Sequence, residues 1–186
     1  MPDDLRAEED AWIRAAQAGD ADAFGHLFRR YHERTVRTHL AMMGSEAEAR
    51  EVAQQAWIKA WQKIDRYNFE SSFSTWLHRI GVNTALDAIR ARKRNHQRGT
   101  AIEEIEEKPS HAPTPAKQTQ LNEQWREMLA ALDQLPEDQR SALVLRELKG
   151  YSYQEIADAT GVKTGTVMSR LHAARQKLAT LWSSNS

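Results

Sequence analysis

The chain has no cysteine, little glycine or proline, and no long apolar run. Without cysteine, disulfide bonds and thiolate chemistry are excluded. Only 8 glycines and 5 prolines occur among 186 residues, which leaves long uninterrupted stretches that favour helices. No apolar segment approaches the ~18 residues that a membrane span needs, and no signal-peptide pattern is present. We therefore expect a cytoplasmic protein that does not insert into a membrane.

Motifs for catalysis or metal binding are also missing. The chain has no H-E-x-x-H sequence and no glycine-rich phosphate loop. The histidines of residues 26–39 fall six and seven positions apart on one predicted helix, and the three do not share one helix face. A helical metallohydrolase is thus the weakest alternative, and we expect a non-enzymatic protein with no catalytic residue, no metal and no cofactor.

Charge is balanced in total but uneven along the chain. The 26 basic and 26 acidic residues cancel, yet the first 22 residues are mainly acidic. One basic run comprises Arg90, Arg92, Lys93, Arg94 and Arg98, and residues 162–182 carry four Lys or Arg and no acid. Two separate basic segments are typical of a protein that contacts phosphates, although a solvated surface is the simpler alternative.

Residues 152–181 predict a helix-turn-helix. Ser152 and Glu155 have the spacing of a capping box, and Gly161 suits the sharp turn that follows. In the second helix one apolar stripe comprises Val167, Leu171, Ala174, Leu178 and Leu181. The opposite side is polar and basic, as in a helix that enters the DNA major groove. The alternative is an ordinary amphipathic hairpin with a solvated basic face.

Helical periodicity extends over nearly all of the remaining chain. Helices are predicted over residues 4–18, 21–44, 45–64 and 73–94, and again from about Leu121, with Pro136 as the first residue of a later helix and Leu148 in its core. Between the helix that ends near residue 94 and the helix that starts near Leu121 lies an acidic, proline-containing segment without an apolar face. The fold class is therefore all-α, with small helical domains at 1–95 and 121–186 joined by a flexible linker at 96–120.

Aromatic residues surround the break at residues 65–72. An aromatic-rimmed loop beside a basic helix suits single-stranded DNA, because unstacked bases pack on aromatic rings. The residues favoured for base contact are Tyr67, Asn68, Phe69 and Asn83, and those favoured for phosphate contact are Arg90, Arg92, Lys93 and Arg94. Trp76 and Leu77 are expected in the core instead. Trp57 and Trp61 could be core or interface, and we expect at least one to be partly exposed.

With these segments in order, the chain resembles the extracytoplasmic-function sigma factors of bacterial RNA polymerase. The resemblance spans nearly the whole chain and rests on three stretches: REVAQQAWIKAWQKI, FESSFSTWLHRIGVNTALDAIRARKR and LPEDQRSALVLRELKGYSYQEIADATGVKTGTVMSRLHAARQKL. It implies that the first stretch docks on the beta-prime subunit, the second binds the minus-10 element, and the third binds the minus-35 duplex. The residues implied for polymerase docking are Glu51, Gln54, Trp57 and Trp61.

The resemblance also implies partners and a mechanism. The chain would bind core RNA polymerase through its beta-prime and beta subunits, hold the melted non-template strand of the promoter, and be controlled by an anti-sigma factor. The residues implied for minus-35 contact are Thr164, Thr166, Ser169, Arg170, His172 and Arg175. Met168 and Ala173 are apolar where many members carry Lys or Arg, so the preferred minus-35 bases stay open.

Two other classes remain as alternatives. A repressor or activator would use the same helix-turn-helix on duplex DNA, with the N-terminal helices dimerising or sensing a ligand. Such a protein has no need for an aromatic-rimmed loop before a basic helix. A pure interaction protein would leave both basic segments without a role.

Overall fold

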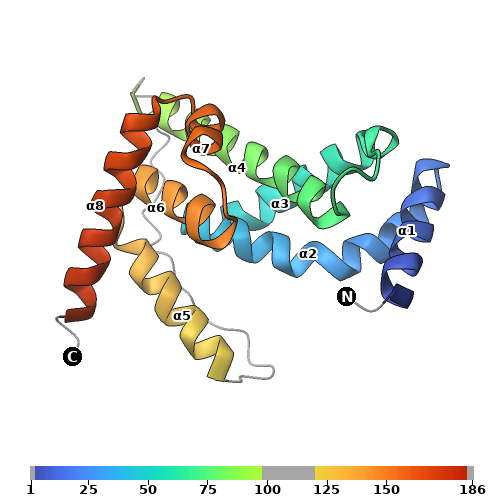
Figure 1. Cartoon of the computed structure of the whole chain (residues 1–186), viewed down its shortest axis with the longest axis horizontal. Helices are drawn as coiled ribbons and strands as arrows, with labels where there is room; N and C mark the ends of the chain where they lie inside the picture. The colour runs from blue at the N-terminus through green and yellow to red at the C-terminus, as the bar shows by residue number, and fades with distance from the viewer. Residues whose placement is uncertain (1–2, 98–119, 184–186) are drawn as a thin grey trace.

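The structure, a computed structural model, describes residues 3–97 and 120–183 (Figure 1). These residues form α-helices and short connections, with no β-strand among them, which confirms the all-α prediction. The N-terminal elements are α1 (Asp3–Gln17), α2 (Ala21–Met43), α3 (Glu46–Gln62), the 3₁₀ turn η1 (Ile64–Arg66) and α4 (Phe73–Gln97). The C-terminal elements are α5 (Gln120–Asp133), α6 (Glu137–Leu143), the π-helical η2 (Val144–Leu148), α7 (Tyr153–Thr160) and α8 (Thr164–Ser183). Most of the predicted linker lies outside the described residues.

Several helix ends follow local sequence signals. The Ser45 hydroxyl accepts a hydrogen bond from the Glu48 amide at the start of α3. Ser152 and Glu155 form the predicted capping box at the start of α7, and Gly161 ends that helix with φ of 71°. Pro136 differs from the prediction: it is the residue before α6, with φ of −52° and ψ of 142°, and not the first helical residue.

One apolar cluster joins the N-terminal helices. Ile13 of α1 and Leu27 of α2 are fully buried, and Trp57 of α3 and Phe73 of α4 are nearly so. Leu77 is also buried, as predicted. This cluster holds η1 and the loop at residues 67–72 against α1, because Ile64 and Tyr67 belong to it as well.

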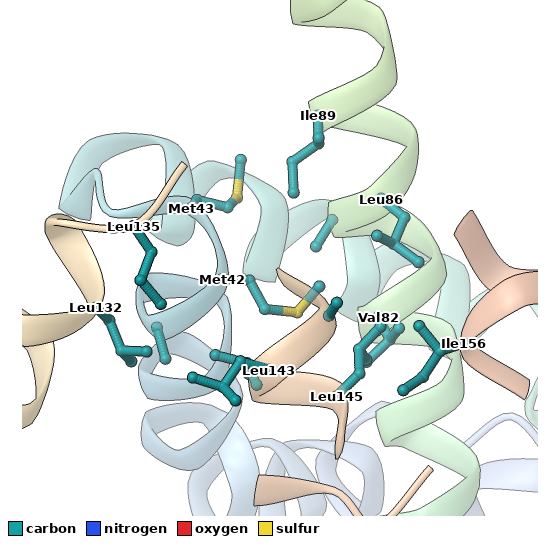
Figure 2. Packing of buried hydrophobic residues seen from close by; sticks show 14 of the residues in the cluster. Met42, Met43, Val82, Leu86, Ile89, Leu132, Leu135, Leu143, Leu145 and Ile156 are labelled. Carbon is teal, nitrogen blue, oxygen red and sulfur yellow. The ribbon is translucent and has the colours of Figure 1, made fainter. Parts of the chain in front are cut away.

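A second, larger cluster is shared by the N-terminal and C-terminal helices. Met42 of α2 and Val82 of α4 are fully buried in it, beside Leu145 and Ile156 from the C-terminal half (Figure 2). Leu171 of α8 belongs to the same cluster. Each fully buried aliphatic side chain contributes about 1.5–3 kcal/mol to stability. The two halves of the chain therefore pack on one another through a continuous apolar core.

Leu148 does not occupy the core position that was predicted for it. Its side chain is 43% exposed, at the end of η2. A π-helical turn contains more residues than an α-helical turn, so the residues after it rotate away from the buried face. The periodicity of an uninterrupted α-helix was therefore the wrong basis for placing this residue.

His39 lies where α2 crosses α4. Its side chain is 1% exposed, and a β-carbon placed on Gly81 of α4 would lie 2.8 Å from the His39 Nε2. Glycine thus permits the close approach of the two helices. Burial lowers the pKa of His39 to about 4, despite contacts with backbone of Gly81 and Ala49 that raise it. Burial also lowers the pKa of His78 on α4 to about 3.

Acidification is expected to destabilise the fold between about pH 6.5 and pH 4. In this window His39 and His78 are protonated in the unfolded chain but stay neutral in the folded chain. The free energy of unfolding therefore decreases as the pH is lowered. Each histidine contributes a slope of up to about 1.4 kcal/mol per pH unit. Urea unfolding at several pH values should show a shallower slope for His39→Gln. The matched control His172→Gln, which removes an exposed histidine, should retain the wild-type slope, and an unchanged slope in His39→Gln would contradict the assignment.

Candidate nucleic-acid and protein interfaces

The outer face of α8 is polar and exposed. Val167, Leu171 and Ala174 are buried against the rest of the C-terminal half. The other side of the helix presents the exposed residues Gly165, Thr166, Ser169, His172, Arg175 and Gln176. The apolar stripe fixes the rotation of α8, so four predicted minus-35 contacts are exposed together: Thr166, Ser169, His172 and Arg175. The other two, Thr164 and Arg170, are half-buried. This geometry suits insertion of the helix into a major groove.

Local hydrogen bonds organise the start of α8. The Thr164 hydroxyl donates to Gln154 Oε1 of α7 over 3.1 Å. The Ser169 hydroxyl donates to the backbone carbonyl of Thr166 over 2.9 Å. The turn between α7 and α8 is thereby tied to both helices.

The two predicted arginines of α8 are paired with carboxylates of the same half. Arg170 Nη2 lies 2.8 Å from Asp138 Oδ2 of α6. Arg175 Nη2 lies 2.7 Å from Glu147 Oε1 of η2. A phosphate that contacts either arginine therefore replaces the carboxylate or binds the guanidinium N–H groups that the carboxylate leaves free.

Three predicted phosphate contacts on α4 also have partners. Arg92 pairs with Glu48 at 2.6 Å and with Glu137 of α6, and Lys93 Nζ lies 3.0 Å from Asp138 Oδ2. Arg90 donates to Asp87 over 2.6 Å and to the carbonyl of Ala159 in α7 over 3.1 Å. The predicted contacts Asn83 and Arg94 are exposed on the same helix.

Asp138 connects the two predicted DNA-binding surfaces. Its Oδ2 atom is contacted both by Lys93 of α4 and by Arg170 of α8. Glu137 and Asp138, called here the α6 acidic pair, thus form ion pairs with basic side chains of both surfaces. These ion pairs are partly exposed to solvent, where such pairs contribute only about 0–1 kcal/mol each. Phosphates could therefore replace the acidic pair at small cost.

The loop after η1 buries one of its two aromatic residues and leaves the other half-buried. Tyr67 is 5% exposed, and its hydroxyl donates to the Ser71 carbonyl over 2.6 Å. Phe69 is half-buried with φ of +62°, a left-handed conformation that is costly for an aromatic residue. The Arg14 guanidinium lies 4.8 Å from the centre of the Phe69 ring. Asn68 is exposed between them, so Asn68 is accessible in this arrangement and Tyr67 is not.

An apolar groove of about 600 Å³ lies between α2 and α3. Its exposed apolar side chains are Phe28, Ile58 and Trp61, which are 37%, 51% and 37% accessible. The polar residue Gln54 lines the same groove, and Glu51 is exposed one turn away on α3. An exposed cluster of this kind is typical of a protein-binding surface.

Trp57 and Trp61 behave differently in this groove. Trp57 is 4% exposed, and its ring packs edge-on against Phe24 and Phe28, with centroids 5.5 Å and 5.1 Å away. Trp61 is partly exposed, which confirms that at least one of the two tryptophans reaches the surface. Phe28 and Ile58 were not singled out from the sequence. Ile58 could have been found, because it falls outside the stripe formed by Val52, Ala56 and Ala60.

No group of three or more His, Asp or Glu side chains in residues 3–97 and 120–183 could hold a metal ion. None of the described helices combines the length and apolar character needed to cross a membrane.

Comparison with known families and proteins places two sequence regions in this fold. Residues 27–95 match the family described as Sigma-70 region 2, and residues 125–178 match the family described as Sigma-70, region 4. The first region runs from α2 to α4 and contains the exposed groove residues Phe28, Ile58 and Trp61. The second runs from α5 into α8 and contains the helix-turn-helix.

Curated relatives match most of the chain. It is 33% identical over 183 residues to the ECF RNA polymerase sigma-E factor of Haemophilus influenzae, covering 91% of this chain and 93% of that protein. It is 34% identical over 182 residues to the protein of the same name from Escherichia coli, with 89% and 90% coverage. A third relative, the ECF RNA polymerase sigma factor SigE of Mycolicibacterium smegmatis, is 33% identical, and the chain spans 60% of its length.

Two solved structures match most of the chain in fold. The sigma factor RpoE from Bartonella quintana, determined in complex with the anti-sigma factor NepR, matches with a TM-score of 0.61 and 28% identity. That match covers 86% of this chain and 96% of the solved chain. CnrH, determined in complex with the cytosolic domain of CnrY, matches in fold with a TM-score of 0.56 at 22% identity, covering 96% and 99% of the two chains.

Proposed function

Because this chain belongs to the extracytoplasmic-function sigma factors of bacterial RNA polymerase, we propose distinct tasks for its two halves. As a sigma factor it directs promoter-specific transcription initiation. The N-terminal half binds core polymerase and the minus-10 element, and the C-terminal half binds the minus-35 duplex. The observation that supports this division best is the exposed polar face of α8, which lies in a different region from the apolar groove. Bond formation belongs to the polymerase, and the chain acts in the cytoplasm as a non-catalytic subunit.

Polymerase docking is assigned to the groove between α2 and α3. An apolar stripe of a partner helix would cover Phe28, Ile58 and Trp61, while Gln54 and Glu51 supply hydrogen bonds at the rim. Trp57 is buried and does not contact the partner directly. Its ring packs against Phe28 and holds that side chain in position. The partner in this assignment is the beta-prime subunit, with the beta subunit contacting the C-terminal half.

The minus-10 strand is assigned to the loop and to α4. Asn68, Phe69 and Asn83 would contact unstacked bases of the non-template strand, with Arg90 to Arg94 along its phosphates. Tyr67 can join them only if the loop turns its ring outward and breaks the hydrogen bond to Ser71. Stacking on a base would offset that loss.

Promoter binding requires the α6 acidic pair to release its partners. Lys93 and Arg170 are held by the same carboxylate of Asp138, so both DNA surfaces are partly neutralised in the packed arrangement. Separation of the halves on core polymerase would free both groups for phosphates. An anti-sigma factor, like the one bound to RpoE from Bartonella quintana, is proposed to hold the chain away from polymerase.

The purified chain is expected to co-elute with core bacterial RNA polymerase and to produce start sites on fragmented host genomic DNA that depend on its presence. Trp61→Ala and Ile58→Ala should each weaken binding to core by about tenfold or more, since they remove exposed apolar contacts at an interface centre. Fluorescence anisotropy of the labelled chain measures this affinity. The matched control is Leu5→Ala, an exposed leucine of α1 outside the groove. Equal weakening in all three variants, or no binding to core by the wild type, would overturn the docking assignment.

His172→Ala should reduce promoter affinity of the holoenzyme without changing its assembly. The side chain lies on the exposed face of α8, and loss of one base contact costs about 1–3 kcal/mol. Filter binding on a promoter obtained from the start sites above measures the change. On the same promoter with scrambled minus-35 bases, wild type and variant should bind equally. A penalty that persists on the scrambled promoter would place His172 outside base recognition.

A further inference from the structure

A cavity of about 310 Å³ lies where the two halves of the chain meet. Its walls come from α2, α4 and the segment between η2 and α7, so both halves are needed to form it. It is separate from the groove between α2 and α3 and from the exposed face of α8. Its size is at the lower end of the range for small-molecule sites.

The lining of this cavity is strongly basic. Arg34 of α2, Arg79 of α4 and Lys149 after η2 all line it. Within residues 3–97 and 120–183, none of these three side chains has an ion-pair or hydrogen-bond partner. In contrast, Arg92, Lys93 and Arg170 are all paired. Three unpaired cations around one cavity repel one another, and this repulsion favours a bound anion.

The one carboxylate that lines the cavity is already engaged. Glu155 Oε2 accepts a hydrogen bond from the Ser152 amide over 2.8 Å, as part of the cap of α7. His78 also lines the cavity, and its buried Nε2 has no hydrogen-bond partner among the described residues. Burial and the charge of Arg34 lower the pKa of Lys149 to about 8, so the amine remains mostly protonated at neutral pH. The cavity therefore offers three cations and one unsatisfied ring nitrogen against the single negative charge of Glu155.

We infer that this cavity binds the diphosphate group of a small molecule, such as pyrophosphate or a nucleoside diphosphate. Two arginines can each contact phosphate oxygens through paired N–H groups, and Lys149 supplies a point charge from the C-terminal half. A multiply charged anion satisfies all three cations at once. A singly charged anion would leave repulsion between Lys149 and the arginines.

Such a ligand would hold the two halves together. It contacts Arg34 and Arg79 on one half and Lys149 on the other, and it therefore favours the packed arrangement over any open one. In that arrangement Lys93 and Arg170 are occupied by Asp138. The ligand is thus an inhibitor of promoter binding, a consequence that rests on the proposed function, whereas the binding site itself does not.

Isothermal titration of the full chain with inorganic pyrophosphate, and separately with GDP, tests the site. Lys149→Gln and Arg79→Gln should each lower the affinity by about tenfold or more, because each removes a charge-assisted hydrogen bond. The matched control Lys163→Gln removes an exposed lysine outside the cavity and should bind as the wild type does. Arg79 is exposed, so Arg79→Gln remains informative if Lys149→Gln fails to fold. No binding by the wild type, or equal losses in the control, would overturn the proposal.

Two further measurements test the ligand class and its effect. Sulfate at equal ionic strength should bind at least tenfold more weakly than pyrophosphate, and equal binding would reduce the cavity to a general anion site. Pyrophosphate should lower the affinity of the wild-type chain for core polymerase, because binding to core separates the halves, but it should not lower that of Lys149→Gln. A rise in the wild-type affinity for core would contradict the inhibitory role while leaving the binding result intact.

Discussion

The packing of the C-terminal helices on α2 and α4 is the interaction on which the rest of the structure depends. Met42 and Val82 from one half are buried with Leu145, Ile156 and Leu171 from the other. This shared core brings α6 beside α4, which places the α6 acidic pair next to Arg92 and Lys93. It also closes the cavity between the halves. Pairing of the basic groups and formation of the cavity are therefore consequences of one apolar contact.

The relative strengths of these interactions determine which partner can open the chain. The partly exposed ion pairs of Asp138 contribute about 0–1 kcal/mol each, whereas each fully buried aliphatic side chain contributes about 1.5–3 kcal/mol. DNA phosphates can replace the carboxylates, but they cannot bury the apolar surfaces that separation would expose. An apolar protein surface can bury those surfaces. We therefore expect core polymerase, rather than promoter DNA alone, to separate the halves.

Local features were predictable from the sequence because they depend on neighbouring residues. The capping box of Ser152 and Glu155 and the turn at Gly161 lie within ten positions of one another. The pairing of Lys93 with Asp138 joins residues 45 positions apart and depends on how whole helices pack, which periodicity does not describe. Leu148 was misplaced because a π-helical turn interrupts the α-helical period. The inward position of Tyr67 likewise depends on a loop conformation that no spacing rule specifies.

We expect the two halves to separate on polymerase, and a change in the distance between them would detect this separation. The chain has no cysteine, so Gln55→Cys on α3 and Gln176→Cys on α8 place two spin labels at exposed sites without background. Pulsed electron paramagnetic resonance would compare the free chain with the complex formed with core polymerase. We expect one short, narrow distance population in the free chain and a longer one in the complex. The same distribution in both states would contradict the separation.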